Sequence, residues 1–397
     1  MTVDRETNLE YQVGALMYTP AFNEKIANKL IDKRFELPYS LAFCLEDSIQ
    51  DYNIELAEQK MCDSLRKIYN AIESGQICLT NLPLIFVRIR NPKHMLKVQQ
   101  KLSKLSEIVC GYILPKFDLS NAAEYRAGIR KINAESNKHM VVMPILETTD
   151  VIDIRTRRDT LSELKMIIDG MKESVLNVRV GGNDFCNLYA VRRNSKQTIY
   201  DIAVLNSVIS DILNVFSSEY VVSAPVWEFF GNDTSSGHNW LTGLKRELEL
   251  DVLNGFIGKT AIHPSQIPEI CKSLMVYESD YEDAKHILNW KDENFGVFKS
   301  SSITSNHIRM NEVKTNSNWA KKIMLLGELY GIKADEGDIS NERDVFSQRN
   351  ALNQRNVFNQ RNVLNQRNVL NQREVFNKSD MLWGTSVMEH INESDML

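Results

Sequence analysis

Short apolar runs rich in β-branched residues recur along the first two thirds of this 397-residue chain, with amphipathic segments between them. They lie at residues 14–19, 41–46, 84–90, 110–115, 140–147, 176–184, 219–226 and 256–263. Each interval is long enough for a loop, a helix and a return loop, as in 54–75, where apolar residues recur at spacings of three and four before a glycine. The alternation predicts repeated βα units around a parallel sheet.

The eight predicted strands favour a (β/α)₈ barrel, with an open doubly wound sheet as the alternative topology. In a barrel the functional face is built from the carboxyl ends of the strands and the loops after them. Most of the predicted strands end in polar groups, namely Thr19, Glu46, Asp47, Arg88, Arg90, Lys116, Glu147, Asp184, Glu228 and His263. Any one of these can be a strand reaching solvent. Together they place acids and bases around one mouth of the barrel. Like-charged side chains that converge there require a shared metal ion or substrate to offset their repulsion.

Two of the acids, Glu147 and Asp184, end apolar runs on neighbouring predicted strands. Mg²⁺ prefers oxygen ligands and keeps several waters, so one or two carboxylates and a chelating substrate are enough to hold it. We therefore expect these two acids to bind a divalent metal. A structural ion pair of Glu147 with Lys116 or Arg88 is the alternative.

The composition narrows the classes of partner. The chain is 43% hydrophobic and 25% charged, with a formal net charge of −5 and a pI near 5.9, which gives no electrostatic reason to expect nucleic acid or an anionic membrane. No apolar run approaches the roughly 20 residues that cross a bilayer, so we expect a cytoplasmic protein. The six cysteines form no CxxC pair, which indicates neither a zinc site nor a disulfide framework.

Six motifs occur in the same order as in a known family: CLEDSIQD at 44–51, FVRIRNP at 86–92, GYILPKFD at 111–118, PILETTD at 144–150, GGNDF at 181–185 and GFIGKTAIHPSQ at 255–266. As a set they resemble the HpcH/HpaI aldolase/citrate lyase family, specifically members similar to the citrate lyase beta subunit. Segments 280–288 and 309–330 resemble the C-terminal arm of these proteins. The arm is most similar to the branch of TIM-barrel C–C bond lyases associated with tellurium-resistance genes.

The resemblance implies a Mg²⁺-dependent lyase that cleaves or forms a carbon–carbon bond next to a carbonyl. Its small-molecule substrate carries a carboxylate and is an acyl-CoA or a 2-oxo acid. By position, Glu147 and Asp184 match the family's metal ligands, and Arg88 matches the arginine that grips the substrate. The planar fork of an arginine suits a carboxylate better than a lysine does.

Further positions follow from the same resemblance. Glu46 and Asp47 match an acidic pair that orients waters or the substrate arginine, with a solvated strand end as the alternative. Lys116 matches a Pro-Lys that neutralises substrate charge or pairs with Glu147. Glu312 stands where related lyases carry an aspartate that reaches a neighbouring subunit's site, which implies a homo-oligomer and makes Glu312 a candidate catalytic residue.

Other features leave alternatives open. The basic loop containing Arg192 and Arg193 either meets a phosphate-bearing substrate or CoA, or is solvated surface. His263 is expected to have a structural role rather than to act as a base. The family's first-strand arginine near Gly14 is absent, and Cys44 replaces an aspartate. Metal binding should survive these departures, since Glu147 and Asp184 are intact, but they put CoA and the usual substrate in question. The alternative function takes them as signs of lost turnover, in a non-catalytic barrel that binds a metabolite or a protein.

The chain divides into a predicted barrel at 1–270, a helical arm or lid at 271–334 and a tail at 335–397. A hexamer of the type VFNQRN repeats over residues 345–380. Six residues turn a helix through about 600°, so the apolar pair forms no continuous face. The repeat predicts a poorly structured Asn/Gln-rich linker, with an interaction segment as the alternative.

Overall fold

The computed structural model describes residues 8–32, 38–231, 239–291, 296–300 and 309–335, all within one unit, Asn8–Ser340. The predicted tail with its hexamer repeat lies outside these residues, except at position 335. Within the described ranges, no helix is long and apolar enough to cross a membrane.

Eight parallel strands form one sheet in the order β7-β6-β5-β4-β3-β2-β1-β8. β1 pairs with β8, and a bridge from Ala224 to Lys259 joins the region after β7 to β8, so the sheet nearly closes into a barrel. The neighbour order follows the chain and never reverses, which confirms the predicted (β/α)₈ barrel and excludes the doubly wound sheet. The strands are β1 Ala15–Pro20, β2 Tyr39–Cys44, β3 Leu84–Arg88, β4 Gly111–Leu114, β5 Val141–Leu146, β6 Val178–Val180, β7 Val222–Ser223 and β8 Lys259–Ala261.

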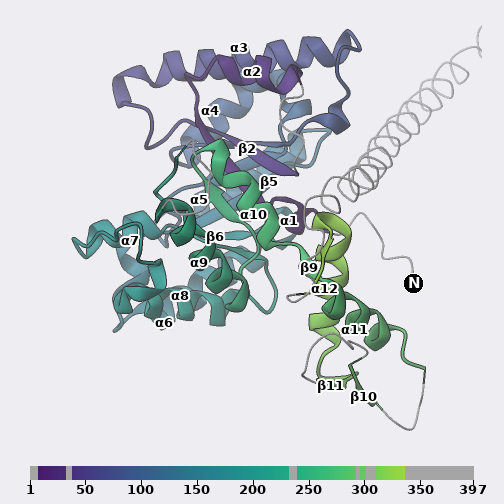
Figure 1. Ribbon diagram of the computed structural model, residues 1–397. Helices are drawn as coiled ribbons and strands as arrows, with labels where there is room; N and C mark the ends of the chain where they lie inside the picture. The colour runs from purple at the N-terminus through teal and green to yellow at the C-terminus, as the bar shows by residue number, and fades with distance from the viewer. Residues whose placement is uncertain (1–7, 33–37, 232–238, 292–295, 301–308, 336–397) are drawn as a thin grey trace, which may run out of the picture. The chain divides into compact units, whose positions relative to one another are not determined.

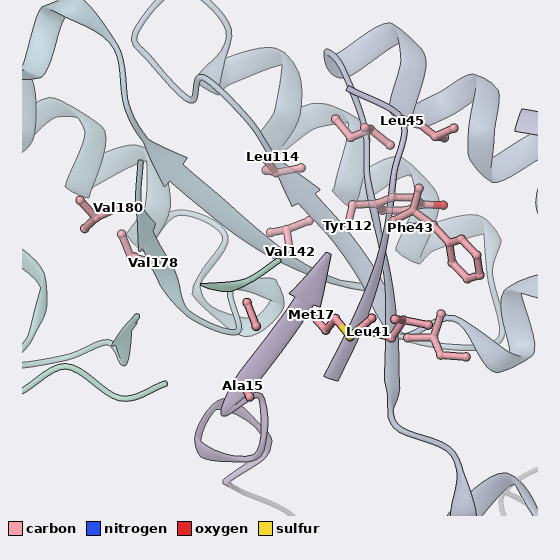
Figure 2. Close-up of a cluster of buried hydrophobic side chains, with 14 of the residues drawn as sticks. Ala15, Met17, Leu41, Phe43, Leu45, Tyr112, Leu114, Val142, Val178 and Val180 are labelled. Atoms are coloured by element: carbon pink, nitrogen blue, oxygen red, sulfur yellow. The ribbon is translucent and has the colours of Figure 1, made fainter. Parts of the chain in front are cut away.

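Side chains along each strand alternate between two buried layers, because successive residues of a strand point to opposite faces. Figure 2 shows one layer, in which Met17, Phe43, Tyr112, Val142 and Val178 belong to the large core shared with the helices. The intervening residues form a second, smaller cluster inside the barrel, which contains Leu16, Ala42, Phe86, Ile113 and Met143. The pattern fixes which residues further along each strand face the barrel interior.

Amphipathic helices supply the outer half of the large core (Figure 1). In α3, Met61, Leu65 and Ile68 are fully buried at helical spacing, each worth about 1.5–3 kcal/mol of transfer free energy. α3 ends before Gly75, whose φ of 73° suits the left-handed turn that stops a helix. The helices of the barrel region are α1 Leu9–Gln12, α2 Lys25–Ile31, α3 Ile54–Glu73, α4 Pro92–Leu102, α5 Ala122–Glu135, α6 Arg157–Asp169, α7 Gly182–Leu188, α8 Ala203–Phe216, α9 Asn239–Leu253 and α10 Ile267–Ser273.

The closure of the barrel depends on a close backbone approach at Gly258. Its φ of 74° is in the left-handed region, and a Cβ there would lie 2.3 Å from the carbonyl oxygen of Gly14. Lys259 N–H donates a 3.1 Å hydrogen bond to the same oxygen. Only glycine fits a position that needs both this φ and this contact.

After α10 the chain forms a short strand, β9 Val276–Tyr277, which pairs in parallel with β12 Ile332–Lys333. Between them, α11 Glu278–Leu288 packs on α12 Ser317–Tyr330, and β10 Val297–Lys299 pairs antiparallel with β11 Met310–Glu312. The Tyr330 hydroxyl donates a 2.6 Å hydrogen bond to the carbonyl of Tyr11. The end of α12 is therefore tied to the segment that precedes β1.

Candidate active site

Five charged residues gather where β2, β3, β4 and β5 end, and we call them the mouth cluster: Glu46, Asp47, Arg88, Lys116 and Glu147. Arg88 is the last residue of β3, and the other four follow their strands by one to three positions. Because the carboxyl ends of parallel strands meet at one face of a barrel, positions 30 or more residues apart in sequence come together.

Arg88 lies at the centre of the mouth cluster and is only 6% exposed. Its Nη2 is 2.8 Å from Glu46 Oε2, 3.0 Å from Asp47 Oδ2 and 3.6 Å from Glu147 Oε1. Burial opposes its charge, but the neighbouring Tyr18 and carboxylates raise the pKa of Arg88 above its ordinary value. The side chain is therefore a fixed cation whose Nη2 lies against carboxylate oxygens.

Lys116 contacts the cluster through both its side chain and its backbone. Its Nζ forms ion pairs with Glu46 and, at 3.2 Å, with Asp47 Oδ1. Its backbone N–H donates a 2.9 Å hydrogen bond to Glu147 Oε1 from a residue with φ of 48°. A non-glycine residue in this region is uncommon, so the turn after β4 is shaped to present this N–H to Glu147.

Glu147 is the most deeply buried acid of the cluster, at 4% exposed. Burial, together with the negative charge of Asp184, raises its pKa to about 8, although Arg88 and the Lys116 N–H oppose the shift. Its carboxylate lies against Gly181, where a Cβ would be 2.2 Å from Oε2. A glycine after β6 is therefore required for the carboxylate to occupy its place.

The structure places Asp184 in the first turn of α7 rather than at the end of a strand, which corrects the predicted 176–184 strand. β6 ends at Val180 because the chain turns at Gly181 and begins a helix at Gly182. The negative charge of Asp184 raises the pKa of Glu147, so the two acids remain close enough to interact. A carboxylate in a helix's first turn also lies near the positive end of its dipole.

The pKa values of the two remaining acids shift in opposite directions. Burial raises the pKa of Glu46 despite the charge of Arg88. Burial would also raise the pKa of Asp47, but its hydrogen bond with Glu46 and the charges of Arg88 and Lys116 lower it overall. The exposed acid is thus the one that remains ionised most readily, and the inner acids resist ionisation unless further positive charge is present.

The side chains predicted to bind Mg²⁺ at the mouth are the carboxylates of Glu147 and Asp184. Among the described residues, no three His, Cys, Asp or Glu side chains are grouped as metal ligands. A pair of interacting carboxylates, one of them held largely protonated by burial and by the other's charge, nevertheless fits a cation that takes one or two carboxylates and fills its remaining positions with water and substrate.

The barrel interior beneath the mouth contains polar residues that the sequence interpretation missed. Arg179 lies between Val178 and Val180 of the outer layer, so it points into the barrel. It is 1% exposed and donates from Nη2 to Thr260 Oγ1 at 2.8 Å. Tyr18 is also an inward residue, with the Arg88 guanidinium 5.5 Å from its ring centroid. The signal available in the sequence was a single arginine inside the apolar run LNVRV.

The predicted substrate-binding arginines of the 191–196 loop do not join the mouth cluster. Arg192 has an 83% exposed side chain that pairs with Glu228 at 3.0 Å. Arg193 is buried; it pairs with Glu247 and stacks on Trp227. Neither interpretation of this loop as a whole, ligand contact or solvated surface, describes Arg193, because α9 brings a buried carboxylate to it.

Arg193 belongs to a second buried ionic group, which we call the closed network: Arg193, Tyr200, Glu247, Asp251 and Lys259. Lys259 Nζ lies 2.8 Å from both Glu247 Oε1 and Asp251 Oδ2, and the Tyr200 hydroxyl donates to Asp251 at 2.7 Å. This group lies on the helix side of the barrel wall, since Lys259 alternates with the inward Thr260.

Two further predicted positions lie away from the mouth cluster's contacts. Glu312 ends β11 and accepts a 2.9 Å hydrogen bond from Thr315; its role at a neighbouring subunit stays a prediction. His263 caps the turn at Pro264–Gln266, accepts from Ser265 N–H at 3.3 Å and stacks on Phe230. These contacts give His263 the structural role that was expected.

The fold and the site define the class: a parallel (β/α)₈ barrel with an acidic, arginine-centred mouth at the carboxyl ends of its strands. The family model for C–C bond lyases of the TIM-barrel fold matches residues 7–332. The chain belongs to this family of TIM-barrel C–C bond lyases, which confirms the resemblance seen in its motifs. No curated protein matches the sequence.

Three solved structures are similar to this chain at low identity. A citrate lyase from Burkholderia xenovorans is 14% identical with a TM-score of 0.57, over 82% of this chain and 94% of that one. The Mycobacterium tuberculosis protein CitE, solved with magnesium, acetoacetate and coenzyme A, is 15% identical with a TM-score of 0.49, over 79% and 98%. The M. tuberculosis citrate lyase beta subunit, solved with oxaloacetate and magnesium, is 16% identical with a TM-score of 0.43, over 67% and 99%.

Proposed function

We propose that this protein is a Mg²⁺-dependent carbon–carbon bond lyase that acts on a small substrate carrying a carboxylate. The observation that carries the proposal is the buried Arg88 guanidinium, held by three carboxylates at the strand ends of a barrel whose family consists of C–C bond lyases. Acids outnumber bases there, so the site has room for added positive charge.

Glu147 and Asp184 would hold the metal, since the charge of Asp184 reaches the buried Glu147 carboxylate and raises its pKa. When bound, Mg²⁺ supplies positive charge where an enolate oxygen develops as the carbon–carbon bond breaks. The backbone N–H of Lys116 fixes the orientation of Glu147. No step requires Glu147 to move far from its present position.

Arg88 would take the substrate's carboxylate. Its Nη2 is shared among three acids, and its buried Nε has no hydrogen-bond partner among the described residues, so a donor is available to the incoming anion. Lys116, whose side chain is 46% exposed, lies at the solvent side of the cluster and balances the charge of Glu46 and Asp47. The arrangement selects an anion with a carbonyl close to its carboxylate, such as a 2-oxo acid.

The test is calorimetric titration of MgCl₂ into the wild-type protein and into Asp184→Asn. We expect the variant's affinity to fall by about tenfold or more, since losing even a supporting group of a metal site costs about 10–100-fold. Asp150→Asn, an exposed acid in the loop after β5, is the matched control and should bind like wild type. Equal Mg²⁺ affinity in Asp184→Asn and wild type would remove the metal assignment.

Turnover is then tested with pyruvate, oxaloacetate and acetyl-CoA, alone and combined, in the presence of MgCl₂. Consumption or formation of a carbon–carbon bond by wild type, lost in Arg88→Met, supports the lyase. Binding of these compounds without any turnover favours the alternative, a barrel that binds a metabolite without catalysis. The absence of a first-strand arginine and the presence of Cys44 are the observations that keep this alternative under test.

A further inference from the structure

Among the residues that the structure describes, Arg179 is a buried cation without an acidic partner. Its Nη2 donates to the Thr260 hydroxyl, it hydrogen-bonds the side chain of Tyr18, and its Nη1 is buried with no partner. Both partners are neutral, whereas Arg88 has three carboxylates around it. A guanidinium taken out of water without an anion is costly, and apolar residues of similar size would stabilise the barrel better. The burial of Arg179 indicates that a neighbouring group becomes an anion for part of the time and then pairs with it.

Tyr18 is the group next to Arg179 that can become an anion. It lies on β1, two residues closer to the carboxyl end of the strand than the buried Leu16, and it is only partly buried itself. A guanidinium can only donate hydrogen bonds, so the Tyr18 oxygen accepts from Arg179 and its own O–H proton is directed elsewhere. With the Arg88 guanidinium over its ring, Tyr18 lies between two fixed cations.

We propose that Tyr18, positioned by Arg179, transfers a proton to the substrate in the mouth of the barrel. The inference rests on the proposed lyase function and names a residue for the step that the mouth cluster leaves without one. Arg179 is a positioning residue in this scheme, because it acts through Tyr18 from beneath.

In the cleavage direction the carbon–carbon bond breaks and its electron pair stays on the substrate's α-carbon as an enolate. The carbinol proton passes to a carboxylate of the mouth cluster or to water. The phenolic proton of Tyr18 passes to the α-carbon, and the phenolate formed is held by Arg179 and Arg88 until it regains a proton from water. No oxidant or further reactant is needed.

The charged and titratable groups around Tyr18 agree with this role. Burial raises the pKa of Tyr18, and Glu147 and Cys44 act in the same direction, while Arg88 and Arg179 lower it. The phenol is therefore protonated before the reaction, as a proton donor must be. The two arginines oppose the cost of forming the phenolate, so donation becomes easier than from an isolated buried tyrosine.

The first measurement follows exchange of the methyl protons of pyruvate in D₂O with MgCl₂, by NMR. We expect Tyr18→Phe to lose about 10²–10⁴-fold of the wild-type exchange rate, the usual contribution of a positioned acid or base. Tyr112→Phe is the matched control, because Tyr112 is buried on the outer face of β4 and bonded to Gln99, and it should exchange like wild type. Thermal unfolding of each variant shows that it is folded.

The second measurement titrates Tyr18 directly, using ¹³C-labelled tyrosine with the Tyr18 signal assigned by its loss in Tyr18→Phe. Arg179→Met should lower the fraction of ionised Tyr18 at a given pH by tenfold or more, and Arg179→Lys should restore much of it. The exchange rate should follow the same order. This readout needs no substrate, and a purely structural Arg179 would not move it.

The outcomes separate the two proposals. A wild-type protein that does not bind Mg²⁺ defeats the proposed function, whatever Tyr18 does. A protein that binds Mg²⁺ but exchanges pyruvate equally fast with and without Tyr18, or does not exchange it at all, overturns the role of Tyr18. An unchanged Tyr18 titration in Arg179→Met overturns the role of Arg179.

Discussion

The mouth cluster and the closed network are two ionic groups of one barrel that differ in charge balance and in exposure to solvent. In the closed network two cations, Arg193 and Lys259, face two acids, Glu247 and Asp251, and all four are buried. At the mouth, Glu46, Asp47 and Glu147 are paired with Arg88 and Lys116, and Asp184 adds a further negative charge near Glu147. Asp47 and Lys116 have side chains that are 55% and 46% exposed.

The two groups show which properties distinguish a candidate functional site from a structural cluster of charges. Burial and close ion pairs occur in both groups and so do not discriminate between them. An imbalance of charge combined with access to solvent occurs only at the mouth, and these are the two properties that a cation and an anionic substrate require. If the two groups differ in this way, changes in them should have unequal effects on the free energy of unfolding and on ligand binding.

Glu247→Gln should be the most destabilising change, because it leaves Arg193 and Lys259 short of an anion in a closed space. Breaking a buried pair by removing one partner costs about 3–5 kcal/mol of the free energy of unfolding. Urea unfolding of the purified variant measures this. Glu147→Gln is the control, and it should cost far less because the mouth has an excess of acids. Equal losses in the two variants would end the distinction between the clusters.

Removal of Mg²⁺ should lower stability through the mouth alone. A ligand present at 100 times its dissociation constant adds about 2.7 kcal/mol to the free energy of unfolding. The melting temperature of wild type should therefore fall when EDTA replaces MgCl₂, whereas that of Asp184→Asn should fall less, because at the same MgCl₂ concentration a site about tenfold weaker adds only about 1.4 kcal/mol. A fall of equal size in the variant would show that the metal binds elsewhere.

Arg88→Lys should weaken substrate recognition while keeping the charge. A lysine cannot offer two parallel donors to a carboxylate, so we expect pyruvate, in the presence of MgCl₂, to bind about tenfold more weakly, equivalent to about 1.4 kcal/mol. Calorimetry measures the affinity. The exposed Arg192→Lys is the control, since its partner Glu228 lies outside the mouth cluster; a weakening as large as that of Arg88→Lys would transfer the anion site to the 191–196 loop.

The smallest change in the free energy of unfolding is expected for an ionic cluster on the protein surface, which differs in exposure from both groups. Glu219 pairs with Lys165 at 2.9 Å and Lys172 at 3.0 Å, and these hydrogen bonds lower its pKa to about 2 from 4.5. A lowered folded pKa means that the pairs stabilise the protein above pH 4.5 and that this contribution fades as pH falls toward 2. Urea unfolding of Glu219→Gln should differ slightly from wild type at pH 7 and converge with it toward acid pH. A difference independent of pH would contradict this, and added salt should reduce it.

Much of the fold and part of the candidate site could be predicted because they depend on local pattern. The eight apolar runs predicted the eight strands, and their polar ends predicted Arg88 and Glu147 at the mouth. The predicted ion pair of Glu147 with Arg88 and the predicted metal site are compatible, because the 3.6 Å contact with Arg88 coexists with a nearby Asp184. The site roles themselves stay predictions.

Other features could not be predicted from one sequence. The 176–184 run looked like one strand, yet its last residues turn at Gly181 into α7, because Gly181 must make room for the Glu147 carboxylate. Arg193 looked like a surface charge, yet a helix more than 40 residues further on buries it against Glu247. Each depends on a contact between segments far apart in the chain.

The sequence by itself determined the class of fold, the order of the strands and the acids and bases at their ends, because periodicity and strand length are local properties. Only the tertiary structure decided which side chains share a space. Closure of the barrel sets the inward direction of Tyr18 and Arg179, brings β1 beside β8 and Tyr18 of β1 within hydrogen-bonding reach of Arg179 of β6, and separates the unbalanced charges of the mouth from the balanced charges of the closed network. Which residues face one another across the barrel depends on closure of the sheet, so it cannot be inferred from their spacing in the sequence.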